Sequence, residues 1–108
     1  MNELTLAEIE LTGENFVETW LAENGYSNIT KAVVHSNTKE IRANSKLEGI
    51  IVQVKTFLHP ARPFKLSEYE AHKITLRASR NKNTAYAAYV VIDSNKELVG
   101  EIQWERLR

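Results

Sequence analysis

The sequence has no cysteine, only two prolines and four glycines, and no apolar run near the roughly 18 residues that a membrane-spanning helix needs. The lack of cysteine excludes a disulfide framework, a thiolate zinc site and a cysteine nucleophile. The start, Met1-Asn2-Glu3, has none of the basic character of a signal peptide, so we expect a cytoplasmic protein with no membrane segment. With 108 residues, 43% hydrophobic and 26% charged, the chain predicts one globular domain over 1–108.

The formal net charge is zero, because fourteen Lys and Arg residues balance fourteen Asp and Glu residues. These charges are segregated along the chain. Residues 1–30 hold six Glu and no basic residue, a net charge of −6, whereas residues 31–82 hold eleven basic and four acidic residues, a net charge of +7. Such a basic segment can form a basic face on a neutral protein, and a mixed solvated surface is the alternative. Neutrality therefore does not exclude an anionic partner.

Hydrophobic periodicity predicts the element order α-β-β-β-α-β-β. The predicted helices span 12–25 and 67–81, and the predicted strands span 29–36, 40–44, 50–58, 87–93 and 98–107, with turns at 37–39, 46–49 and 94–96. Thr12 is the predicted N-cap of the first helix and Gly25 its stop. Residues 4–11 also have helical periodicity, with Thr5 and Glu8 at the spacing of a capping box, and whether they join this helix is left open. Ser67 and Glu70 have the spacing of a capping box at the start of the second helix.

Two polar residues interrupt the apolar strand 50–58. Gln53 and Lys55 project from the same face, and a lysine on a central strand needs either a partner or access to solvent near the strand end. If the preceding turn is centred on Leu47-Glu48 with an even number of residues, Glu40 faces Lys55 and Arg42 faces Gln53. A turn with an odd number of residues would send Glu40 to the other face. The four side chains then predict either a structural salt bridge or a functional site.

This pattern resembles the PD-(D/E)xK nuclease superfamily, particularly its Holliday-junction-resolvase-like and Mrr-like restriction members. The resemblance covers about 12–107. Glu40-Ile41-Arg42-Ala43 stands where the family has its Asp-led strand, Gln53-Val54-Lys55 stands where it has (D/E)xK, and Gly13-Glu14 stands where resolvase-like members carry an additional acid. The resemblance implies an α/β, restriction-endonuclease-like fold with an αβββαβ core, in which a mixed sheet is flanked by helices.

The resemblance also implies a metal-dependent DNA endonuclease that hydrolyses phosphodiester bonds, in branched or foreign DNA. The implied ligands of Mg²⁺ or Mn²⁺ are Glu40, Gln53, the Val54 carbonyl and Glu14, and Lys55 would stabilise charge on the phosphate. Two positions depart from the family: Glu40 stands in place of the leading Asp, and Gln53 stands in place of the acid of (D/E)xK. The alternatives are therefore a catalytically degenerate module that binds nucleic acid or a protein partner, and an interaction domain unrelated to nucleic acid.

Basic residues of the second predicted helix indicate a possible contact with DNA. Lys73, Arg77 and Arg80 recur at i, i+4 and i+7, which places them within an arc of about 60° on a helix. Together with Arg42, Arg62 and Lys65, they are expected to bind phosphates without reading sequence. An ordinary solvated helix face is the competing interpretation. Because a domain this small has difficulty enclosing a duplex alone, a homodimer is expected.

Overall fold

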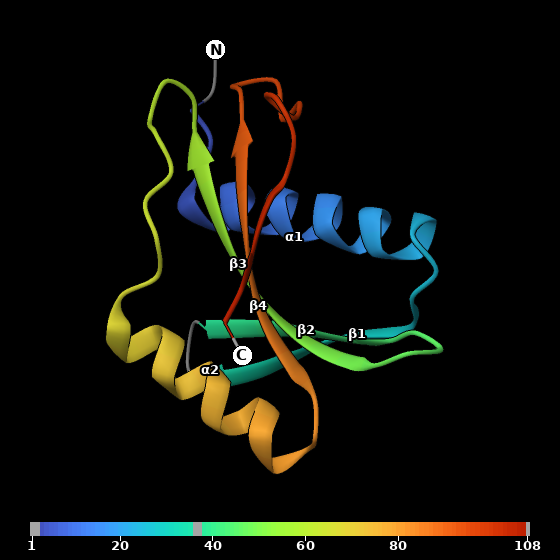
Figure 1. Ribbon diagram of the computed structural model, residues 1–108. Coiled ribbons are helices and arrows are strands. Elements are labelled where there is room, and N and C mark those ends of the chain that lie inside the picture. The colour runs from blue at the N-terminus through green and yellow to red at the C-terminus, as the bar shows by residue number, and fades with distance from the viewer. Residues whose placement is uncertain (1–2, 36–37, 108) are drawn as a thin grey trace.

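The computed structural model describes residues 3–35 and 38–107 and shows an α/β architecture (Figure 1). In chain order its elements are α1 (Leu6–Glu23), β1 (Ser27–His35), β2 (Thr38–Asn44), β3 (Gly49–Leu58), α2 (Glu68–Arg80), β4 (Thr84–Ile92) and β5 (Gln103–Arg106). The strands form one mixed sheet in the order β1-β2-β3-β4-β5, in which β3 and β4 are parallel and the other neighbours antiparallel. In the described ranges, no helix has the length and apolar composition required to cross a bilayer.

The first helix is longer than predicted. Thr5, rather than Thr12, is the N-cap, because its hydroxyl accepts a hydrogen bond from the Glu8 N–H and the Glu8 carboxylate accepts one from the Thr5 N–H, both at 3.1 Å. Residues 6–11 therefore belong to α1, and Thr12 lies inside it with its hydroxyl bonded to the Glu8 carbonyl. The predicted stop is confirmed, since Gly25 has φ +88°, a conformation that glycine adopts without strain.

The turn between β2 and β3 shifts the predicted register by two residues. Ser45 organises this turn: its hydroxyl accepts hydrogen bonds from the N–H groups of Leu47 and Glu48, and its own N–H donates to the Glu48 carbonyl. The loop is therefore 45–48, and Asn44 pairs with Gly49. The predicted pairings of Glu40 with Lys55 and of Arg42 with Gln53 are wrong.

In the observed register, Glu40 lies opposite Gln53 and Arg42 lies opposite Ile51. Because the shift is an even number of residues, the side chains of Glu40 and Arg42 stay on the same face of the sheet as Gln53 and Lys55. The prediction that these four side chains share one face is confirmed, although the opposed partners differ.

The C-terminal half differs from prediction mainly in its last strand. The capping box of Ser67 and Glu70 is confirmed at the start of α2. The strand predicted over 98–107 is reduced to Gln103–Arg106, with an isolated bridge between Ile92 and Leu98, because Gly100 has φ +74° and interrupts the extended chain. The turn predicted at 37–39 is partly replaced by strand, because Thr38 and Lys39 belong to β2. Residue 37 lies outside the described residues, and so does residue 36, the last residue of the strand predicted before this turn.

The two helices cover opposite faces of the sheet (Figure 1). The face under α1 carries the larger apolar cluster, which includes Val17 and Leu21 from the helix and Val52 and Val90 from the sheet. The face under α2 has smaller apolar clusters and also buries two polar side chains, those of Glu40 and Gln53. Buried polar groups need partners, so this face is where a site or a structural polar network has to be sought.

Candidate functional site

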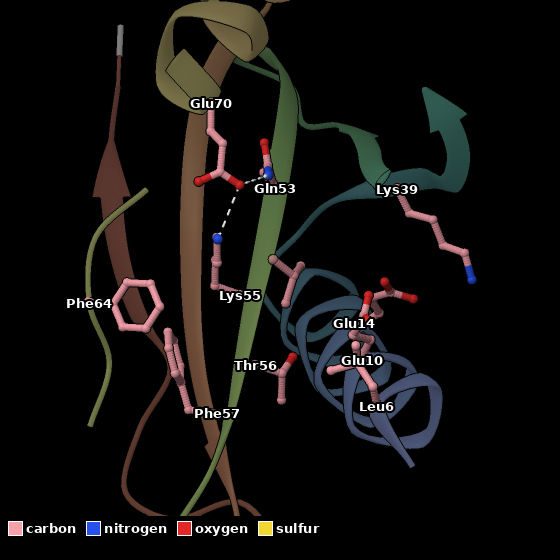
Figure 2. A pocket seen from close by; sticks show the side chains of 11 residues that line it. Leu6, Glu10, Glu14, Lys39, Gln53, Lys55, Thr56, Phe57, Phe64 and Glu70 are labelled. Carbon is pink, nitrogen blue, oxygen red and sulfur yellow. Dashed lines mark hydrogen bonds and ion pairs between the residues drawn. The ribbon is translucent and has the colours of Figure 1, made fainter. Parts of the chain in front are cut away.

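A cleft of about 390 Å³ lies along the part of β3 that extends beyond β2. The pairing of β2 with β3 ends where Glu40 meets Gln53, whereas β3 continues to Leu58 beside β4. The cleft is lined by Leu6, Glu10, Glu14, Lys39, Gln53, Val54, Lys55, Thr56, Phe57, Phe64 and Glu70 (Figure 2). It therefore brings together four of the residues predicted for the site, namely Glu14, Gln53, Val54 and Lys55.

Glu14 reaches this cleft because α1 approaches β3 very closely. At Gly13, an added Cβ would lie only 2.8 Å from the Cβ of Thr56, so glycine is needed at the point of contact. The next residue, Glu14, is nine-tenths buried, and its Oε1 lies 3.4 Å from the Nζ of Lys31. The carboxylate is thus held beside β3 by an ion pair on the α1 side.

The partner of Lys55 is Glu70 of α2, not Glu40. Glu70 Oε2 lies 3.1 Å from Lys55 Nζ and accepts a hydrogen bond of 3.4 Å from Gln53 Nε2 (Figure 2). Burial alone would raise the pKa of Glu70, but hydrogen bonds from the Ser67 backbone and from Lys55 outweigh it and lower the pKa below its ordinary value. Glu70 is therefore an ionised acceptor shared by Gln53 and Lys55.

Sequence reasoning missed Glu70 because its capping role already explained it. One signal was present: Glu70, Ile74 and Arg77 follow one another at i, i+4 and i+7, the spacing of a single helical face. Ile74 is fully buried against the sheet, so Glu70 and Arg77 face the sheet with it.

Glu40 is fully buried and lies outside the cleft lining. Its Oε1 accepts a hydrogen bond from the Nε of Arg77, and its Oε2 lies 3.5 Å from Nη2 of Arg42. Two guanidinium groups therefore neutralise this carboxylate, and the contact with Arg77 ties α2 to β2. In this arrangement, Glu40 does not offer an oxygen to the cleft.

The basic residues predicted to bind DNA are dispersed over several surfaces. Arg77 is turned towards the sheet and Glu40, whereas Lys73 lies over the ring of Tyr69 at 5.3 Å from its centroid. Arg80 is exposed at the end of α2, and Arg62 is exposed in the segment between β3 and α2. The remaining two residues are Lys65, whose Nζ lies 3.5 Å from Glu105 Oε2, and the half-exposed Arg42. The contacts of all six basic residues with DNA stay a prediction.

The oxygen donors of the cleft fit a divalent cation that keeps several of its waters. Glu14, Gln53 and Val54 line one cavity, and between them they carry a carboxylate, an amide oxygen and a backbone carbonyl. Mg²⁺ is commonly held by one or two carboxylates together with water and substrate phosphate, and this donor set meets that requirement. Over residues 3–35 and 38–107, no three His, Asp or Glu side chains come together as a metal-binding group, so a cage built only from such side chains is not present there.

Comparison of the sequence with protein-family models finds no match, and a search of curated proteins likewise finds none. The function has to be argued from the cleft and its chemistry, because a fold supports many unrelated activities.

Proposed function

We propose that the protein is a metal-dependent DNA endonuclease of the PD-(D/E)xK type, with the cleft beside β3 as its active site. The observation that carries the proposal is that Gln53, Val54, Lys55 and Glu14 line one cleft, at the point where β2 leaves β3. The element order and the mixed sheet between two helices are consistent with the αβββαβ core that the resemblance implies.

In this proposal, Lys55 binds the scissile phosphate and stabilises the charge that develops on it. Lys55 is paired with Glu70 in the protein described here, so an incoming phosphate oxygen would compete with that carboxylate for the ammonium group. Glu14, the Gln53 amide oxygen and the Val54 carbonyl would hold Mg²⁺ or Mn²⁺. When bound, such an ion polarises the phosphate and lowers the pKa of a coordinated water.

Glu40 has a positioning role in this proposal, in place of the ligand role expected from sequence. Its carboxylate holds Arg77 and Arg42, and its backbone pairs with Gln53. The pair with Arg77 sets the position of α2, and α2 carries Glu70 to Lys55. Glu40 therefore supports the cleft through α2 and β3 without entering it.

The test is a cleavage assay on supercoiled plasmid and on branched DNA with Mg²⁺ or Mn²⁺. We expect nicking or cleavage that EDTA abolishes and that Lys55→Ala abolishes. Lys46→Ala is the matched control, because Lys46 is an exposed lysine in the turn before β3 and should leave the activity unchanged. Cleavage that survives Lys55→Ala would contradict the assignment.

A second candidate function is a module of the same fold that binds nucleic acid or a protein without hydrolysis. The pairing of Glu40 with two arginines favours it, because one of the expected metal ligands is engaged elsewhere. Calorimetry that detects no Mg²⁺ or Mn²⁺ binding, together with DNA affinity that falls steeply with salt, would select this candidate. Salt-insensitive association with a protein would favour an interaction domain instead.

Sedimentation of the protein with and without DNA tests the expected homodimer.

A further inference from the structure

Phe64 is a large apolar side chain that remains 65% exposed on the segment between β3 and α2. Its ring is nevertheless held in place, because it packs edge-on against Phe57 with the ring centroids 5.0 Å apart and an interplanar angle of 74° (Figure 2). This contact leaves much of the ring surface open to solvent. An exposed aromatic ring held this way is a candidate for contact with a ligand.

The backbone around Phe64 is also anchored. Pro63 restricts the chain just before it, and the N–H of the buried Leu66 donates a hydrogen bond of 3.1 Å to the hydroxyl of Tyr89. Ser67 then begins α2 with its capping box. Binding to a ring that is already placed costs little further ordering of the protein.

Phe64 stands between two hollows. On one side is the cleft, in which Lys55 Nζ lies 5.7 Å from the centroid of the Phe64 ring. On the other side is a hollow of about 380 Å³, within the size range of pockets that bind small molecules. The second hollow is lined by Pro63, Phe64, Lys65, Tyr89, Gln103, Trp104 and Glu105. Neither the proposed catalytic chemistry nor the apolar core accounts for this hollow.

The second hollow combines an aromatic wall with hydrogen-bonding groups. Gln103 offers an amide, and the carboxylate of Glu105 accepts a hydrogen bond of 2.6 Å from Tyr89. This hydrogen bond lowers the pKa of Glu105, which leaves the carboxylate ionised as an acceptor. An aromatic face with nearby amide and carboxylate groups suits a nucleobase, which has a π face and a polar edge.

We propose that this hollow takes one unpaired base of the DNA whose backbone lies in the cleft, and that Phe64 stacks on that base. The proposal rests on the proposed function and specifies its substrate class as DNA with unpaired nucleotides. Lys55 on one side of Phe64 would bind the phosphate, and Lys65, which is paired with Glu105, lies on the other side. A base inside a continuous duplex is stacked on both faces and reaches Phe64 only after the cost of unstacking is met.

The test measures DNA binding by fluorescence anisotropy in EDTA at one fixed salt concentration, so that cleavage does not contribute. Phe64→Leu should weaken binding of a labelled single strand by about 5- to 100-fold, the equivalent of one lost stacking contact, and should leave duplex binding unchanged. Phe64→Trp should keep the single-strand affinity, because it retains an aromatic ring. Leu47→Ala is the matched control and should leave binding unchanged, since Leu47 is an exposed apolar residue that lines neither hollow.

A scan with a single abasic site makes the test specific. Removing the stacked base from the strand should weaken binding to the wild-type protein and have no further effect on Phe64→Leu. Unchanged single-strand affinity in Phe64→Leu, or an equal loss on duplex and single strand, overturns the inference. If the wild-type protein cleaves DNA but Phe64→Leu keeps its substrate preference, only this inference fails. If the wild-type protein neither binds nor cleaves DNA, the proposed function fails with it.

Discussion

Replacement of Arg77 by methionine tests whether the buried pair with Glu40 holds α2 on the sheet. The Glu40 side chain is 0% exposed and the Arg77 side chain is 18% exposed, so both charges are largely removed from water. Methionine keeps the helix propensity and most of the aliphatic stem of Arg77 but leaves the carboxylate of Glu40 without its main partner. We expect the free energy of unfolding to fall.

The expected magnitude follows from the burial of the pair. Removing one partner of a buried ion pair costs about 3–5 kcal/mol, because the remaining charge is left desolvated. Arg42 stays 3.5 Å from Glu40, and its own side chain is 44% exposed, so it offsets part of this cost. We therefore expect a loss of about 2–3 kcal/mol, which for a chain of this length lowers Tm by roughly 10 °C.

The assay is urea denaturation followed by circular dichroism, with the midpoint and the slope fitted separately. Arg80→Met is the matched control, because Arg80 is exposed on the same helix and should change the stability by no more than about 0.5 kcal/mol. The double variant Glu40→Met with Arg77→Met should recover most of the loss, since two apolar side chains of similar volume leave no buried charge. If Arg77→Met costs no more than Arg80→Met, the pair contributes nothing, and Arg77 is free for the DNA contact predicted from sequence.

Three further substitutions test single contacts of α1, α2 and β4. Gly13→Ala should destabilise the protein in thermal denaturation by about 1–3 kcal/mol despite its better helix propensity, because its Cβ would collide with Thr56; a rise in Tm would show that α1 can move away. Ser67→Ala should cost about 1 kcal/mol by urea denaturation through loss of the α2 cap, and an unchanged midpoint would mean that the cap carries no stability. Burial and a hydrogen bond to Glu105 raise the pKa of Tyr89 to about 12, above the ordinary value near 10. The protonated hydroxyl therefore stabilises the fold fully below pH 10, and this contribution is lost as the pH rises towards 12. The stability difference between wild type and Tyr89→Phe should therefore shrink between pH 10 and 12, and a constant difference would contradict this linkage.

Much of the fold follows from signals within a few residues of the chain. Two helix boundaries were predicted correctly, the start of α2 at the capping box of Ser67 and Glu70 and the end of α1 at Gly25. Both signals are local, because a cap depends on residues close in sequence and a glycine stop depends on the backbone of one residue. The alternation along β3 placed Gln53 and Lys55 on one face, because side chains on a strand alternate between faces. A local rule also placed the N-cap of α1 wrongly at Thr12, whereas the observed capping box is formed by Thr5 and Glu8.

The arrangement of the site depended on contacts between distant parts of the chain. Sequence placed Glu40, Gln53 and Lys55 on one face, but the partners of these side chains depended on how Ser45 closes its turn and on how α2 packs. A shift of two residues keeps every side chain on its face, so hydrophobic patterning does not distinguish the two registers. Docking of α2 then brought Arg77 to Glu40 and Glu70 to Lys55, which converted an expected cluster of catalytic charges into two ion pairs. The composition and periodicity of the chain thus specify its helices, its strands and the face on which the charges meet, whereas the pairing of those charges results from long-range packing.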